Sequence, residues 1–126
     1  MTNAMNGLRK TFKQEDTSVE QYRIVTLGTG ADEVVAATDA TAHLVGVTDE
    51  SANATAGNPV GVLLDGIVKV TILAATTKGA KITATTAGKG AATTTATDNI
   101  VGTLLETTTV ANQVAQVQLD QTTLAA

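Results

Sequence analysis

The chain contains no cysteine and no tryptophan, and it has one phenylalanine (Phe12), one tyrosine (Tyr22), one histidine (His43) and one proline (Pro59) in 126 residues. The missing cysteines exclude disulfide bonds, thiolate metal sites and a cysteine nucleophile. An aromatic side chain buries roughly 150 to 250 Å², so the near absence of aromatic residues predicts a thin core of small side chains. Small domains of this kind usually gain stability by oligomerisation, which we expect here.

Groups suited to catalysis are equally scarce, because general acid–base chemistry most often uses histidine and this chain has one. His43 opens an expected strand and has no neighbouring metal ligand in sequence, which favours a simple strand-end residue. The carboxylate pairs Asp32–Glu33 and Asp49–Glu50 are candidate cation ligands, but they fall at turn positions where acidic side chains are well solvated. We therefore expect no enzymatic activity, no catalytic residues, no cofactor and no metal.

The formal net charge is −4 and the isoelectric point is near 4.7, which argues against nucleic acid as a partner because phosphate binding needs a basic surface. No apolar run approaches the roughly 18 to 20 residues of a membrane span. Met1 to Gly7 lacks the apolar segment of a secretory signal. We expect a soluble protein that has no membrane partner.

Residues 1–20 are polar and mixed in charge, and we interpret them as an N-terminal arm that precedes a β-rich domain at residues 21–126. Within the arm, the apolar Leu8 and Phe12 are interleaved with Arg9, Lys10 and Lys13. Leu8 and Phe12 are four residues apart, the spacing of one face of a short helix, but an isolated helix this short is marginal in water. The arm is therefore expected to order against a partner, and its removal should leave the domain folded.

From Tyr22 onward, short β-branched runs alternate with turn residues, which is typical of an all-β domain. Period-two alternation predicts one buried and one wet face, most clearly where Ala115, Val117 and Leu119 alternate with glutamines. The expected architecture is a compact β-barrel or β-sandwich-like domain of about eight short strands. These strands are expected at residues 21–27, 33–37, 43–48, 60–64, 67–73, 80–85, 99–105 and 113–119.

Turn residues separate these runs, and Asp65–Gly66 between two apolar runs predicts a β-hairpin. Gly28–Thr29–Gly30 lacks the further glycine or lysine of a phosphate-binding loop and predicts a turn. Thr86 to Thr97 has no apolar side chain larger than alanine, and we expect a long exposed loop there. The runs at 43–46 and 99–102 both end in Val-Gly, which suggests one strand–glycine–strand arrangement used twice inside one barrel.

Several short motifs occur in a specific order between Ala42 and Leu119, and together they resemble a family of tailed-phage capsid decoration (cement) proteins. In order, the motifs are Leu44-Val45-Gly46-Val47, Val60-Gly61-Val62, Gly66-Ile67-Val68-Lys69-Val70, Lys78-Gly79-Ala80-Lys81-Ile82, Ile100-Val101-Gly102 and Val114-Ala115-Gln116-Val117-Gln118-Leu119. The resemblance implies a β-barrel-like domain on the outer surface of an icosahedral head. Such proteins commonly form trimers and clamp neighbouring major capsid subunits.

On this interpretation the protein is a structural virion component whose partners are the major capsid protein and further copies of itself, with a homotrimer expected. The arm residues Leu8, Arg9, Lys10, Phe12 and Lys13 are then the candidate capsid-binding residues. The alternative is an adhesin-like or carbohydrate-binding β-domain of a phage fibre or surface layer. Sugar sites generally need aromatic platforms, and Phe12 and Tyr22 are the two aromatic residues present.

Overall fold

β-strands make up most of the described chain, and several of them alternate apolar with polar side chains. The computed structural model describes residues 9–15, 20–40, 44–48, 59–94 and 98–123. Within these ranges there are ten strands and one short 3-10 turn, η1. In order, they are β1 (Arg9–Gln14), β2 (Ile24–Leu27), β3 (Glu33–Ala36), β4 (Leu44–Thr48), β5 (Pro59–Leu63), β6 (Ile67–Ile72), β7 (Lys81–Ala84), η1 (Thr86–Gly88), β8 (Gly90–Ala92), β9 (Asn99–Leu104) and β10 (Gln113–Thr123).

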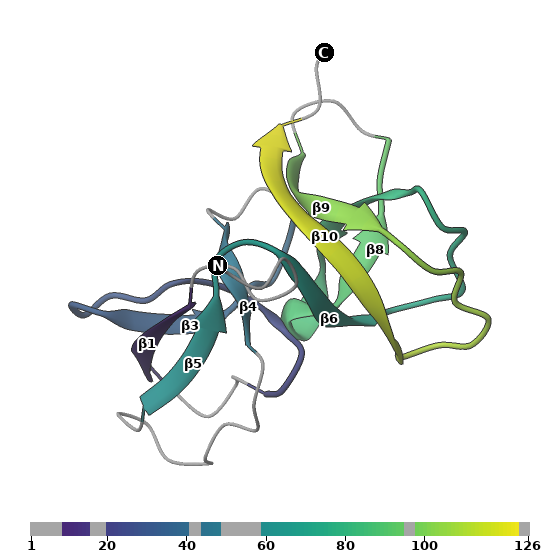
Figure 1. Ribbon diagram of the computed structural model, residues 1–126. Coiled ribbons are helices and arrows are strands. Elements are labelled where there is room, and N and C mark those ends of the chain that lie inside the picture. Colours follow the sequence, from purple (N-terminus) through teal and green to yellow (C-terminus); the bar gives the residue numbers. More distant parts are fainter. Residues whose placement is uncertain (1–8, 16–19, 41–43, 49–58, 95–97, 124–126) are drawn as a thin grey trace, which may run out of the picture.

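The strands close into two small barrels that follow one another along the chain (Figure 1). The first barrel has the strand order β1-β3-β2-β4-β5 and the second has the order β10-β6-β8-β7-β9. In the first barrel β1 runs parallel to β3 and antiparallel to β5, and in the second β6 runs parallel to β8 and antiparallel to β10. The other pairs are antiparallel in both barrels, so β1 to β5 correspond in order to β6 to β10.

The correspondence extends to single residues. Val25 on β2 pairs with Gly46 on β4, and Ile82 on β7 pairs with Gly102 on β9; the register shifts immediately after both pairs. A β-bulge therefore occupies the same place in each barrel, next to the Val-Gly step that the sequence repeats. The repeated motif belongs to two barrels of one topology, not to a single barrel as expected from the sequence.

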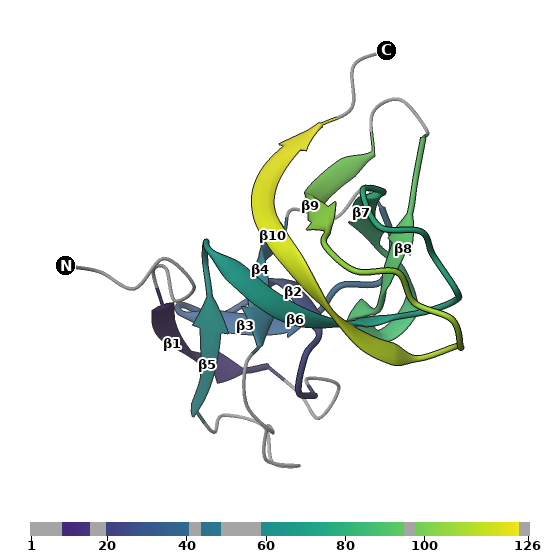
Figure 2. The same cartoon turned by 45° about the vertical axis from the view of Figure 1, so that its right-hand side comes forward.

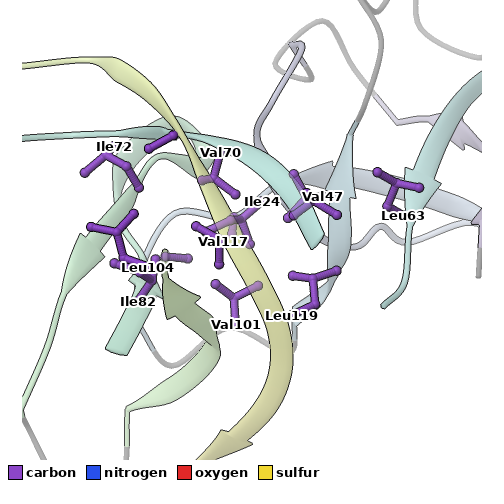
Figure 3. Packing of buried hydrophobic residues seen from close by; sticks show 14 residues of the cluster. Ile24, Val47, Leu63, Val70, Ile72, Ile82, Val101, Leu104, Val117 and Leu119 are labelled. Carbon is purple, nitrogen blue, oxygen red and sulfur yellow. The ribbon is translucent and has the colours of Figure 1, made fainter. Parts of the chain in front are cut away.

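The larger of two hydrophobic clusters spans both barrels (Figure 3). Ile24 and Val47 of the first barrel belong to the same buried cluster as Val70, Val101 and Val117 of the second. Backbone hydrogen bonds also cross the junction seen between the barrels in Figure 2. Their donor and acceptor atoms are Thr71 N to Tyr22 O at 2.9 Å, Gly88 N to Ala37 O at 2.7 Å and Asn99 N to Ala40 O at 2.8 Å.

Turn η1 lies against the start of β2 at this junction. The guanidinium of Arg23 is largely buried and donates from Nη1 to the carbonyl oxygen of Ala87 at 3.1 Å. Gly88 has a φ of 72°, and a Cβ there would stand 2.5 Å from the carbonyl oxygen of Ile24. A glycine is therefore needed where η1 packs against the start of β2.

The fold confirms the expected all-β class and the location of the eight predicted strands. It also confirms the predicted faces of β10, where Val117 is fully buried and Gln118 is exposed. Thr71 alternates with Val70 and Ile72 on β6, so period-two spacing predicts that it faces water with Lys69. It is instead 6% exposed, because its backbone N–H donates to Tyr22 at the junction.

Two local predictions are wrong. Asp65–Gly66 does not form a hairpin, because β5 pairs with β1 and β4 while β6 pairs with β10 and β8. Gly66 has the φ of 91° that its turn requires, but the connection crosses from one barrel to the other. The stretch from Thr86, expected to be a long loop, contains η1 and β8.

Strand β8 lacks a sequence signal because the barrel interior leaves no room for large side chains on it. A Cβ on Gly90 would meet Ile82 Cγ2 at 2.7 Å, and Ile72 Cδ1 and Val70 Cγ1 at 3.2 Å. The large side chains of β6 and β7 fill the space at Gly90, which is the buried residue of β8; Ala91 is partly buried and Ala92 is exposed. The low β propensity of β8 is overridden by tertiary packing.

Candidate functional site

The basic cluster of the expected arm lies on β1, inside the fold. Arg9, Lys10 and Lys13 are exposed, whereas Phe12 is buried at 7% exposure; Leu8 lies outside the described residues. β1 is extended, not helical. It pairs with a neighbouring strand on each side, through five residue pairs with β5 and two with β3. The described part of the segment is therefore an integral strand of the first barrel.

Phe12 explains why this segment joins the barrel. Its ring packs in a cluster with Val25, Val34, Val60 and Val62, all of them fully buried. Burying an aromatic ring supplies a large share of the stability of so small a core. Phe12 is consequently not an exposed anchor in this structure, and the accessible part of the candidate site is the basic outward surface of β1.

Lys10 lies over the side chain of Phe12. Its Nζ atom is 5.0 Å from the centroid of the Phe12 ring and 3.2 Å from Oδ1 of Asp32. Both charged side chains of the ion pair are more than half exposed, so water screens the pair and its contribution to stability is small. Lys10 is positioned by these contacts while its charge stays accessible.

Arg9 and Lys13 project from the outer side of β1. The guanidinium of Arg9 lies on the backbone of Gly61 of β5, where its Nε atom would be 2.9 Å from a Cβ. Lys13 is opposite Pro59 of β5 and Glu33 of β3 in the strand register. The side-chain-free surface of Gly61 thus lets Arg9 lie flat along the barrel, and together Arg9 and Lys13 form what we call the β1 basic face.

The acidic side chains beside this face hold a turn together. Glu15 accepts hydrogen bonds from the backbone N–H and the hydroxyl of Thr29, and Oε1 of Glu33 accepts from Gly30 N at 2.9 Å. This confirms that Gly28–Thr29–Gly30 is a turn, between β2 and β3. Across the described ranges, no three histidine, cysteine or acidic side chains are grouped so that they could hold a metal ion.

His43, Asp49 and Glu50, which the sequence singled out as weak ligand candidates, lie outside the described residues. Tyr22 lies at the junction of the barrels, with a φ of 60° and a partly buried side chain. In the described part of the chain, no helix is long and apolar enough to span a bilayer.

A second exposed surface was missed by sequence analysis. The connection between β6 and β7 is hydrogen-bonded to the connection between β9 and β10 through an antiparallel bridge of Thr76 and Thr108. Thr76 N donates to Thr108 O at 3.2 Å, and Thr108 N donates to Thr76 O at 2.8 Å. The same end of the β9–β10 pair carries three exposed large apolar side chains, which we call the apolar tip. They are Leu105 at 37% exposure, Val110 at 60% and Val114 at 38%.

The sequence did not indicate that the side chains of the apolar tip are exposed, because valines and leucines in a sequence with a thin core are expected to be buried. The signal that was present is local: Val110 follows three threonines and precedes Ala-Asn, a polar setting that is typical of a connection. Scattered exposed apolar side chains are common on protein surfaces. The distinguishing feature here is that the loops carrying them are held together by backbone hydrogen bonds.

The effect of removing residues 1–20 follows from the position of β1. This deletion takes away Phe12 and opens the first barrel, so we expect a melting temperature lower by at least about 10 °C. Removing residues 1–8 leaves β1 in place and is the matched control, with a transition expected close to that of the full chain. Circular dichroism at increasing temperature measures both, and equal transitions would contradict the role of β1 in the stable fold.

The fold of this chain, but not its sequence, matches a known protein. No protein-family model matches the sequence, and no curated protein matches it. Among solved structures, the N base of the head fibre protein gp8.5 of bacteriophage phi29 is similar, with a TM-score of 0.73 and 16% sequence identity. The similarity covers 94% of this chain and 98% of that one. The double-barrel fold of this chain is therefore also the fold of a phage head-fibre base.

Proposed function

We propose that this protein is a non-enzymatic structural component of a tailed-phage virion and that it attaches to the outer surface of the head. The observation that carries this proposal is the fold shared with the phi29 head-fibre base over nearly the whole of both chains. Independently of that similarity, the ordered motifs between Ala42 and Leu119 resemble capsid decoration proteins.

The more specific role we propose is that of a decoration, or cement, protein that clamps neighbouring major capsid subunits and associates as a homotrimer. The thin core supports association: Phe12 is the one aromatic residue in it, and most other members are valine, alanine and isoleucine. A surface rich in threonine suits a durable exterior, because threonine combines strand propensity with a polar hydroxyl.

The alternative, an adhesin-like or carbohydrate-binding domain, is weaker on the structure. Stacking against a sugar needs an accessible aromatic face, and the ring of Phe12 is buried in the first barrel. Tyr22 is partly buried at the junction of the barrels. The chain therefore offers little for sugar stacking.

We propose the β1 basic face as a capsid-contact surface, because Arg9 and Lys13 are exposed on a strand that the barrel holds in place. Charged groups that surround an interface guide association with a surface of opposite sign. The counterpart in this proposal is an acidic patch on the major capsid protein.

The test is co-sedimentation with emptied, expanded heads that lack decoration. The unaltered protein should sediment with the heads, and the double variant Arg9→Glu/Lys13→Glu should bind about tenfold more weakly. The matched control is Lys69→Glu/Lys81→Glu, which reverses two exposed charges on the second barrel and should bind like the unaltered protein.

The outcomes separate the two levels of the proposal. If the unaltered protein fails to sediment with heads, the head-binding function is contradicted. If the unaltered protein sediments and all three proteins bind equally, the head remains the partner and the β1 basic face is not the contact. Light scattering of the free protein measures association, with three times the 12.7 kDa chain mass expected.

A further inference from the structure

The inner side of β1 carries a buried polar side chain that has no partner. Gln14 is fully buried, and neither its Nε2 nor its Oε1 atom has a hydrogen-bond partner. Two buried threonines behave differently: Thr83 donates from Oγ1 to the carbonyl oxygen of Asn99 at 2.7 Å, and Thr48 donates to that of Glu20. Among the described residues, Nε of Arg23 at the junction is also buried without a partner, but the same guanidinium donates from Nη1 to Ala87. A buried amide without partners lowers the stability of the closed structure that contains it.

The repeated topology shows which residue the fold accepts at this position. Gln14 pairs with Val34 where β1 and β3 run parallel, and Ile72 pairs with Gly90 where β6 and β8 run parallel. On its other side, Val34 pairs with Leu27, the last residue of β2, and Gly90 likewise pairs with Ala84, the last residue of β7. Ile72 is thus the counterpart of Gln14, and it is fully buried in the second barrel.

β1, which carries Gln14, contributes to the smaller of the two hydrophobic clusters. Phe12, Val25, Val34, Val60 and Val62 form a separate cluster of five buried residues. The other cluster has 14 buried residues and extends from the second barrel across the junction. Releasing β1 therefore exposes the small cluster and leaves the large one intact.

We propose that β1 is a releasable strand: the first barrel opens at β1 as a local event while the second barrel and the junction stay closed. Local openings of this kind occur where few apolar contacts resist them. The opening leaves the sheet edges of β5 and β3 unpaired and frees β1, with Arg9, Lys10 and Lys13, as an extended segment. This conformational device does not depend on capsid binding.

Amide hydrogen exchange of the intact protein under native conditions tests the proposal. Amides of β1 and β5 should exchange at least about tenfold faster than hydrogen-bonded amides of β6 and β10. Gln14→Ile, which installs the residue of the second barrel, should slow exchange in β1 and β5 by roughly 5- to 150-fold, the effect of removing an unsatisfied buried polar group. Exchange in β6 and β10 should change much less.

A second variant guards against poor fit of a β-branched side chain. Gln14→Met keeps the length of the side chain without its amide and should slow exchange in the same strands. Two results would overturn the proposal: protection of β1 equal to that of β10 in the unaltered protein, or exchange that is unchanged or faster in both variants.

Discussion

Val117→Asp is expected to abolish folding of the whole chain. Val117 is fully buried on β10, where it pairs with Val68 of β6 and Leu104 of β9. An unpaired charge at such a position costs several kcal/mol, while a domain of this size is stable by only about 5 to 15 kcal/mol. Far-UV circular dichroism should show loss of the strand signal and of a cooperative thermal transition.

Because the larger hydrophobic cluster spans both barrels, we expect Val117→Asp to unfold the first barrel as well. Val117 belongs to the same buried cluster as Ile24 and Val47. The single tyrosine, Tyr22, lies at the junction and reports on both barrels, so its near-UV signal should be lost as well. Gln118→Asp places the same charge one residue later on the exposed face and should keep the transition within a few degrees. Similar melting of the two variants would mean that the faces of β10 are assigned wrongly.

Gly102→Ala is expected to destabilise the protein by about 3 kcal/mol, a typical cost of forcing atoms into a filled space. A Cβ on Gly102 would collide with the carbonyl group of Gln118 and stand 3.0 Å from Cγ1 of Val117. The obstacle is the backbone of a paired strand, which cannot turn aside as a side chain can. Gly46 meets the carbonyl of Leu63 in the same way, so Gly46→Ala should have a comparable effect.

Gly79→Ala is the matched control for these two variants. Gly79 has a φ of 91° with no atom within 4 Å of an added Cβ, so substitution costs only the strain of a left-handed backbone, about 1 kcal/mol. Urea unfolding midpoints measure all three variants. If Gly79→Ala proves as harmful as Gly102→Ala, steric contact with β10 is not what requires glycine in the Val-Gly step.

Part of the candidate site could be predicted from the sequence. The clustering of Arg9, Lys10 and Lys13 is visible in the chain, and the structure keeps these side chains exposed. Their setting could not be predicted, because polar residues on the outer side of a strand dilute its apolar signal. In β1 only Phe12 and Gln14 face inward, and Gln14 gives no apolar signal at all.

The sequence by itself determined that this chain is built from β-strands, and where most of them lie. A period-two run such as that of β10 indicates which side chains face the core, because successive residues of a strand point to opposite faces. The tertiary structure decided which strands pair, and so the division into two barrels. Pairing is non-local: Gly66 is followed by a strand that joins β10 and not β5, and nothing near Gly66 encodes that choice. The same holds for β8, where larger side chains from β6 and β7 already fill the space that a side chain at Gly90 would need, so the buried position of the strand carries no apolar signal.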